Sequence, residues 1–218
     1  LEISGYDSLT LLESFQEGYF QVQDVSSMLV GLAADPKEGN VVIDVCAAPG
    51  GKSIHVADLL NGTGHVEARD LTDYKVNLIQ ENIVRSGMKN IEAVRWDATV
   101  LDENSVEKAD VVVADLPCSG LGVLGKKTDL KYKMTEQTQG ELVKLQRDIL
   151  SVAKWYVKPN GTLVYSTCTI HEAENMGNVE WFLLENPDFE LVFSQQLLPG
   201  VHESDGFFIA KFKKVKHG

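Results

Sequence analysis

Short apolar runs alternate with helical patterns along nearly the whole chain, and this alternation restricts the possible folds more than any other feature. The runs end at turn signals, as buried strands do, and the stretches between them have helical spacing. This order predicts an α/β fold, a mainly parallel sheet with helices on both faces. The predicted strands are 41–45, 65–69, 91–95, 111–114, 163–166 and 207–212. The predicted helices are 24–33, 53–60, 74–86, 135–156 and 172–185.

The size of the chain is that of one globular domain, since it has 218 residues of which 44% are hydrophobic. We expect a single domain over 1–218, with 1–34 as a lead-in segment and a helix packed on the core. No apolar run approaches the roughly 20 residues of a membrane span, and the first residues lack a signal-peptide pattern. We therefore expect a cytoplasmic protein, a monomer with no membrane partner.

The cysteines are Cys46, Cys118 and Cys168, an odd number, and none has a close Cys or His neighbour at zinc-ligand spacing. The sequence therefore predicts free thiols and no metal site. The first residue is Leu1 rather than Met. We accordingly expect a fragment whose missing part carries a surface that holds the substrate.

The formal net charge of −12 disfavours binding of nucleic acid by bulk electrostatics, because neutralising phosphates requires clustered Lys and Arg. Two groups of basic residues depart from this balance. One is a set of four lysines within 126–133, and the other is formed by Lys211, Lys213, Lys214, Lys216 and His217. For the second group, solvated surface charge is an equally good interpretation.

Polar or small residues follow five of the predicted strands. In a doubly wound sheet, ligands bind beyond the carboxyl ends of the strands, so these residues indicate function. We expect all five segments to meet at one edge of the sheet. They are Asp44 to Lys52, Asp70, Asp97, Asp115 to Gly122, and Thr167 to Thr169.

The first of these segments joins a strand to a helix through small residues, which lets backbone N–H groups approach a ligand. Its end, Gly51-Lys52-Ser53, matches a phosphate-binding loop, but that motif requires glycine at the position of Cys46. The dinucleotide fingerprint Gly-x-Gly-x-x-Gly is not present. A tight turn without a ligand remains the structural alternative. The residues predicted to line a cofactor here are Cys46, Ala47, Ala48, Pro49, Gly50, Gly51 and Lys52.

Two acidic residues favour a nucleoside cofactor over a nucleotide phosphate, which they would repel. Asp70 follows the loop by about 20 residues, the position at which a carboxylate accepts hydrogen bonds from ribose hydroxyls. A cap on the following helix is an equally good account of Asp70. Asp97 is placed to accept from the exocyclic amine of an adenine, and its structural alternative is an Asx turn.

Two thiols directly follow strands, Cys118 in Asp115-Leu116-Pro117-Cys118 and Cys168 in Ser-Thr-Cys-Thr. Buried cysteines are usually inert, but these two lie at the edge where ligands bind. Thiols beside Asp115 suit attack on an electron-poor pyrimidine. One thiol adds to ring carbon 6, the aspartate hydrogen-bonds ring nitrogen 3, and carbon 5 becomes nucleophilic.

The combination of Cys-Ala-Ala-Pro-Gly-Gly-Lys, Asp-x-Pro-Cys-Ser-Gly-x-Gly and Ser-Thr-Cys-Thr followed by Glu174-Asn175 resembles the Sun/Fmu group of RNA cytosine-5 methyltransferases. The likeness runs from residues 17–24 to residues 205–208. It is closest to members that act on the bacterial small ribosomal subunit. The resemblance implies a Rossmann-like class I fold with a seven-stranded sheet, S-adenosyl-L-methionine as cofactor, and 16S ribosomal RNA as substrate.

The resemblance also implies a role for each site residue. Cys46 to Lys52 line the cofactor site, with Asp70 at the ribose, Asp97 near the adenine and Asp115 between cofactor and base. Cys168 takes the position of the nucleophile. Cys118 takes that of a second cysteine, which assists release of the covalent product. Members of the group carry an N-terminal RNA-binding domain that this chain lacks, which agrees with the acidic charge.

Three other functions stay open from the sequence alone: a transfer RNA cytosine-5 methyltransferase, a non-catalytic RNA-binding module, and a small-molecule methyltransferase. The sequence departs from the group at 124–129, where relatives are more basic, and at Arg69, where they have an apolar residue. We expect the side chain of Arg69 to extend outward. Lys52 is predicted to steer Asp115 or to lower a thiol pKa.

Overall fold

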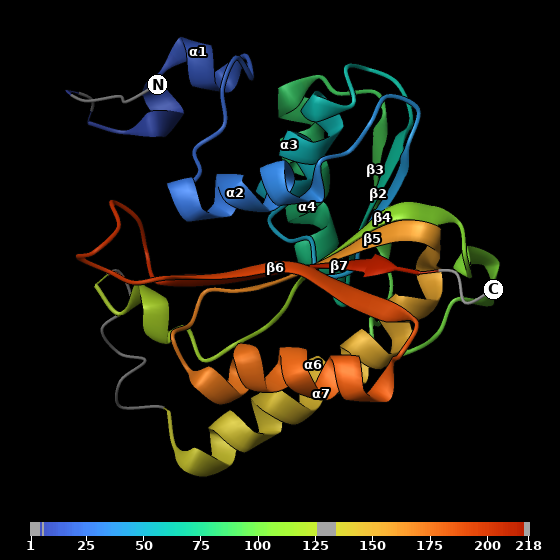
Figure 1. Cartoon of the computed structure of the whole chain (residues 1–218). Coiled ribbons are helices and arrows are strands. Elements are labelled where there is room, and N and C mark those ends of the chain that lie inside the picture. The colour runs from blue at the N-terminus through green and yellow to red at the C-terminus, as the bar shows by residue number, and fades with distance from the viewer. Residues whose placement is uncertain (1–4, 6, 126–133, 216–218) are drawn as a thin grey trace.

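A seven-stranded sheet in the order β3-β2-β1-β4-β5-β7-β6 forms the centre of the molecule (Figure 1). The computed structural model describes residues 5, 7–125 and 134–215. Only β7 runs antiparallel to its neighbours, β5 and β6. The strands are β1 Val41–Asp44, β2 His65–Asp70, β3 Ile91–Arg95, β4 Ala109–Asp115, β5 Val157–Thr167, β6 Phe189–Leu197 and β7 Phe207–Lys214.

Helices cover both faces of this sheet, as the alternation in the sequence predicts. One face carries α2 Val25–Ala34, α3 Gly51–Leu59 and α4 Asp73–Ser86, and the other carries α6 Glu136–Tyr156 and α7 Met176–Glu185 (Figure 1). Short helical elements complete the described chain: η1 Leu9–Leu11, α1 Glu13–Gln16, η2 Glu103–Ser105, η3 Leu121–Val123 and η4 Glu172–Glu174.

Each face of the sheet has its own apolar core. Val42 and Ile43 are neighbours in β1 and point to opposite faces, as strand geometry requires. Val42 packs in the core with Val30 of α2, and Ile43 packs in the other core with Leu150 of α6. The buried central strands are therefore nearly continuous apolar runs, which is why the sequence revealed them.

The ends of the helices follow from their flanking residues. Asp24 accepts a hydrogen bond from Ser26 N at the start of α2, and Thr135 accepts one from Thr138 N at the start of α6. Gly87, with φ of 70°, follows the last residue of α4, Ser86, where the predicted helix 74–86 also ends. Glycine adopts this left-handed conformation at little cost in free energy because it has no Cβ.

Three elements differ from those predicted. The predictions missed β6, because this edge strand has a mostly exposed centre and its apolar run is only three residues long, Leu191 to Phe193. β5 begins at Val157 rather than at 163. Pro159-Asn160-Gly161, which would favour a turn, lies between the paired residues Val157 and Thr162, and a register shift between Ala109 and Val111 of β4 accommodates it within the strand. The predicted helix 172–185 is interrupted at Asn175, whose φ of −109° and ψ of −101° are not helical.

The expectation that Arg69 extends outward is wrong, since its side chain is only 2% exposed. Arg69 Nε pairs with Glu67 at 2.5 Å, and Nη2 lies 3.0 Å from Asp102 Oδ2. The guanidinium also lies near the rings of Trp96 and Tyr156, 5.6 and 5.1 Å from their centroids. Arg69 therefore fastens the segment after β3 to the sheet.

The predicted lysine group within 126–133, and with it most of the altered stretch 124–129, lies outside the described residues. None of the helices in the described ranges has both the length and the apolar character needed to cross a bilayer.

Replacing Arg69 by Met should destabilise the fold by about 3 kcal/mol, because it removes a buried cation and leaves the partly buried carboxylates of Glu67 and Asp102 without their partner. Chemical denaturation measures this difference. The matched control is Arg95→Met, which removes an exposed ion pair with Asp73 and should cost less than about 1 kcal/mol. Equal stability of the two variants would contradict the role assigned to Arg69.

Candidate active site

The register of the central strands brings the segments after β1, β2, β4 and β5 to one edge of the sheet. Asp115 pairs with Ser166 in the β4–β5 ladder, and Asp44 pairs with Val113 in the β1–β4 ladder. Ala48 N donates to Asp70 Oδ2 at 3.0 Å, which joins the loop after β1 to the end of β2. The convergence predicted from the sequence therefore exists in the structure.

The loop after β1 is a narrow turn that leads directly into α3. Gly50, with φ of 104°, is the N-cap residue of α3, and its N–H donates to Ala47 O at 2.7 Å. A Cβ on Gly50 would lie 3.3 Å from the Ile79 side chain and would impose strain at this φ. The turn thus keeps small residues and backbone amides at the edge where a ligand would approach.

Two adjoining cavities meet at Cys46 on this edge. One, of about 90 Å³, has mostly apolar walls and includes the two predicted acids Asp70 and Asp97. The other, of about 190 Å³, is lined by charged groups that include Asp44, Lys52 and Asp115. The two acids predicted to contact a nucleoside thus line one cavity, and Cys46 to Ala48, Pro49, Gly51 and Lys52 of the predicted cofactor loop line the other.

The carboxylate of Asp70 is buried and held in place by three donors. They are Ala48 N, Leu71 N at 2.8 Å and Lys75 Nζ at 3.0 Å. The cap of α4 is Thr72, so the alternative that Asp70 caps this helix is wrong. A carboxylate fixed in this way retains acceptor capacity toward ribose hydroxyls.

Asp97 is exposed and accepts hydrogen bonds from Thr99 N at 2.9 Å and Thr99 Oγ1 at 2.7 Å. These bonds hold the pKa of Asp97 below its ordinary value. The Asx turn given as the structural alternative therefore exists. It coexists with a place in the wall of the apolar cavity, where the ionised carboxylate can accept from an amine.

Asp115 links the loop after β1 to the end of β5. Lys52 Nζ lies 2.8 Å from Asp115 Oδ2, and Ser166 Oγ donates to Asp115 Oδ1 at 2.7 Å. Burial lowers the pKa of Lys52, but the carboxylate of Asp115, with help from Asp44 and Cys168, reverses this effect and raises it overall. Lys52 therefore stays protonated and orients Asp115, as the sequence analysis predicted.

The sulfur atoms of Cys118 and Cys168 are 3.2 Å apart, and both side chains are partly buried. The hydrogen bond to Cys168 raises the pKa of Cys118 strongly, and burial adds to this effect. Cys118 therefore keeps its proton, and Lys52 interacts electrostatically with Cys168. Burial and the carboxylates of Asp44 and Asp70 also raise the pKa of Cys46. This third cysteine therefore stays a thiol and only lines the two cavities.

A buried polar network behind the thiols fixes the two cysteine loops to each other. Glu174 Oε2 accepts from Ser119 N and from Gln146 Nε2, both at 2.9 Å. Ser119 Oγ and Thr169 Oγ1 are 2.8 Å apart and are both buried. The carboxylate of Glu174 is thus a fixed anchor for the loop that carries Cys118.

Asn175 holds the loop that carries Cys168 from both sides. Its Oδ1 accepts from Thr167 Oγ1 at 2.6 Å, and its Nδ2 donates to Thr169 O at 3.0 Å and Gln196 Oε1 at 2.7 Å. From the sequence, Glu174-Asn175 was only part of a motif, and neither residue had a predicted role. The only local signal was a polar pair soon after the end of β5 at Thr167.

Two glycines bring β7 close to the thiols. Gly122 N donates to Cys168 O at 3.1 Å, and Gly206 N donates to Gly122 O at 2.9 Å. A Cβ on Gly122 would lie 1.9 Å from Gly206 O, and one on Gly206 would lie 2.7 Å from Gly122 Cα. Only glycines allow this approach of the two backbones.

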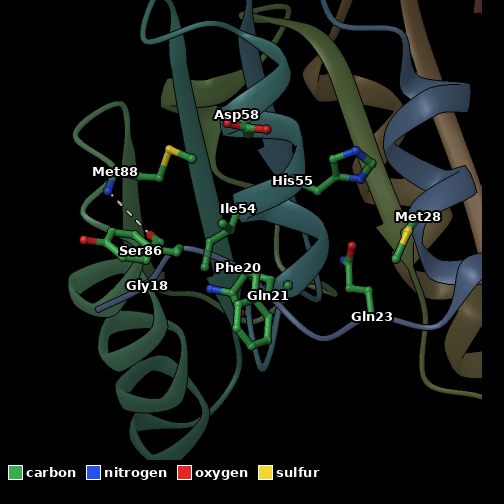
Figure 2. Close-up of a pocket in the computed structure, with 12 residues that line it drawn as sticks. Gly18, Phe20, Gln21, Gln23, Met28, Ile54, His55, Asp58, Ser86 and Met88 are labelled. Atoms are coloured by element: carbon green, nitrogen blue, oxygen red, sulfur yellow. Dashed lines mark hydrogen bonds between the residues drawn. The ribbon is translucent and has the colours of Figure 1, made fainter. Parts of the chain in front are cut away.

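A further cavity of about 250 Å³ lies on the outer side of α3, beneath residues 18–23 (Figure 2). Figure 2 shows His55 of α3 directed toward Met28 of α2, with Gln23 nearby. Gln23 and Gly51 also line the charged cavity at the loop, so Gln23 separates the two spaces. Neither Asp115 nor a cysteine lines this outer cavity, which places it away from the chemistry.

Within the described residues no group of three or more His, Cys, Asp or Glu side chains is arranged to hold a metal ion. The doubly wound sheet with one reversed strand, the small-residue loop after β1 and the acid after β2 define a class I S-adenosylmethionine-dependent methyltransferase. The family model described as 16S rRNA methyltransferase RsmB/F matches residues 31–213. The chain belongs to this family.

Individual relatives of the chain are also RNA methyltransferases. The chain is 41% identical over 218 residues to "Probable ribosomal RNA small subunit methyltransferase B" of Bacillus subtilis, covering 92% of this chain and 49% of the relative. It is 37% identical over 222 residues to the tRNA (cytosine(72)-C(5))-methyltransferase of Pyrococcus horikoshii, covering 96% and 56%. The chain thus spans about half the length of these relatives.

Among solved structures, the chain is similar to NSun6 from Pyrococcus horikoshii with SFG, an S-adenosylmethionine analogue, at a TM-score of 0.88 and 35% identity. This similarity covers 97% of this chain and 57% of that chain.

Burial raises the pKa of Asp44 to about 7, and Asp115 adds to this effect, although Ser53 Oγ donates to Asp44 at 2.6 Å. Between pH of about 4 and about 7 the folded protein therefore holds a proton that the unfolded chain has released. Stability should fall as pH rises through this window, by at most about 1.4 kcal/mol per pH unit. Urea denaturation across pH 4–8 should show a shallower dependence in Asp44→Asn, and an unchanged slope would count against this assignment.

Replacing Asn175 by Asp keeps the shape but places a carboxylate against two acceptors, Thr169 O and Gln196 Oε1. We expect kcat to fall at least about tenfold, since displacement of Cys168 by a fraction of an ångström is costly. The Kd for S-adenosylmethionine, measured by calorimetry, should change less than about twofold. The matched control is Asn178→Asp, equally buried but bonded to Gln146 and Tyr165. An equal loss of kcat in the control would argue against a specific effect on the thiol.

Proposed function

We propose that this chain is the catalytic domain of an RNA cytosine-5 methyltransferase that acts on small-subunit ribosomal RNA through a covalent adduct at Cys168. The observation that carries this proposal is the pair of sulfur atoms 3.2 Å apart, beside Asp115 and at the edge that suits the cofactor. Paired thiols and an aspartate fit addition to a pyrimidine ring.

The cofactor would be held by the loop Cys46 to Lys52, with Asp70 at the ribose and Asp97 at the adenine. The charged cavity around Asp44 and Lys52 would take its amino-acid end. When bound, S-adenosylmethionine supplies an electrophilic methyl group for carbon 5 of the base. The remaining chemistry belongs to the side chains of this chain.

The first step is addition of the Cys168 thiolate to carbon 6 of a cytosine that has left its stack. The ammonium of Lys52 favours the thiolate, because the two groups interact electrostatically. The addition moves the electron pair of the C5–C6 double bond through carbon 4 onto ring nitrogen 3, which takes up the proton released by the Cys168 thiol. The carboxylate of Asp115 accepts the hydrogen bond from the resulting N3–H. Lys52 and Ser166 fix the two oxygens of Asp115, so its orientation is set before the base arrives.

The last step is release, in which the carbon 5 proton passes to solvent, the C5–C6 double bond reforms, and Cys168 leaves and takes back the proton from ring nitrogen 3. The departing thiolate needs a hydrogen-bond donor. Cys118 is suited to this role, since its raised pKa keeps it a thiol and its sulfur is 3.2 Å away. This supports the assignment of Cys118 to product release.

The choice of ribosomal RNA rests on the family description and on the Bacillus subtilis relative. A transfer RNA target is the second candidate, favoured by the relative and the solved structure from Pyrococcus horikoshii. Methylation of unmodified 16S ribosomal RNA and of transfer RNA by the full-length protein discriminates between them. We further propose that the full-length protein holds RNA with a part outside this chain and acts as a monomer.

The two thiols should give opposite results when each is replaced by Ala. Cys168→Ala should abolish transfer of a tritiated methyl group to RNA, because no adduct forms. Cys118→Ala should still form the adduct but release it slowly, so a protein–RNA complex should survive denaturing gel electrophoresis. Full activity of Cys168→Ala would refute the assignment. Inactivity of the unsubstituted full-length protein on every RNA would instead favour a non-catalytic RNA-binding module.

A further inference from the structure

A second concave surface lies at the edge of the sheet opposite the thiols. Its volume is about 450 Å³, and it lies between the amino ends of β4 and β5, the carboxyl end of β7 and the segment after α2. We call it the lysine groove, after the four lysines in its wall. They are Lys37, Lys158, Lys211 and Lys213.

The positive charge of this groove exceeds its negative charge. Lys37 pairs with Asp35 at 2.5 Å and Lys158 pairs with Asp110 at 2.8 Å. Lys211 and Lys213 form no ion pair within the part of the chain that the structure describes. Two unpaired ammonium groups in one concavity are unusual for a chain with a net charge of −12.

The position of these two lysines is set by strand geometry. Residues 211 and 213 are two apart in β7 and so point to the same face. Lys214 points to the opposite face, where its Nζ binds Glu107 and Val157 O at 3.0 Å. Of the basic group near the end of the chain, Lys211 and Lys213 therefore line the groove and Lys214 has a structural role, while Lys216 and His217 lie outside the described residues.

The repulsion between the positive charges of these lysines favours an anion as the ligand. Burial lowers the pKa of Lys211, Asp35 opposes this effect, and the charges of Lys213 and Lys37 lower it further. Glu190 lies opposite Lys213 in the β6–β7 register but forms no ion pair with it. A bound anion would relieve the repulsion among the lysines, and half-buried side chains on a strand lose less entropy on binding than free surface lysines.

We propose that the lysine groove binds the phosphodiester backbone of the RNA substrate at a distance from the methylated base. The groove and the thiols lie at opposite ends of β4 and β5, about 20 Å apart for a seven-residue strand at about 3.3 Å per residue. Phosphate contacts of this kind position a nucleic acid without reading its sequence. The inference rests on the proposed function only in taking RNA as the substrate.

The test compares Lys211→Gln/Lys213→Gln with the wild-type chain. The matched control, Lys89→Gln/Lys144→Gln, removes the same charge from exposed positions away from the groove. Affinity for a fluorescein-labelled 16S ribosomal RNA transcript is measured between 50 and 200 mM KCl. In the groove variant the slope of log Kd against log salt should decrease by about 1 to 2, and in the control by less than about 0.5.

Methyl transfer to the same transcript at saturating concentration separates the groove from the active site. The groove variant should raise KM at least about threefold and leave kcat unchanged, because the thiols and the cofactor loop are untouched. If the proposed function fails, transfer is absent in all proteins while the change in salt slope persists.

An unchanged salt slope in the groove variant, or an equal decrease in the control, would overturn the proposal. A separate experiment measures the effect of inorganic phosphate on thermal stability. If phosphate raises the Tm of the wild-type chain but not of the groove variant, while the RNA slopes are equal, the groove binds a free anion and the proposal for RNA is wrong.

Discussion

The ion pair between Lys52 and Asp115 is the interaction on which the candidate site depends. It joins the first residues of α3 to the end of β4, and so connects the predicted cofactor loop to the strand that precedes Cys118. Ser166 holds the other oxygen of Asp115 and thereby ties in β5, which precedes Cys168. One carboxylate thus sets the relative positions of three segments, and its charge keeps Lys52 protonated beside the thiols.

This arrangement is supported by polar groups that the core would otherwise exclude. Asp44, Glu174 and Asn175 are almost entirely buried, which is costly unless their hydrogen bonds are made. Glu174 and Asn175 use those bonds to hold the two cysteine loops, whereas Asp44 holds the start of α3 through Ser53. Burying these polar groups lowers stability, but their hydrogen bonds fix the separation of the two sulfur atoms. A preorganised site requires such fixed positions.

Much of this could be predicted from the sequence because the signals were local. Apolar runs gave the central strands, and small or polar residues after them gave the loop at Cys46 and the acids Asp70 and Asp115. The edge strand β6 was not predicted because its centre is mostly exposed and its apolar run is only three residues long. Asn175 and the buried Arg69 escaped because their partners lie far away in the sequence or on another strand. Such contacts are set by packing, which periodicity does not report.

We propose that Cys168, and not Cys118, forms the bond to the base. The adduct can be trapped on RNA that contains 5-fluorocytidine, in the presence of S-adenosylmethionine, since fluorine at carbon 5 blocks release. Mass spectrometry of the digested complex then identifies the modified peptide. We expect the nucleotide on the peptide that contains Cys168. A nucleotide on the peptide that contains Cys118 would show that Cys118 is the nucleophile.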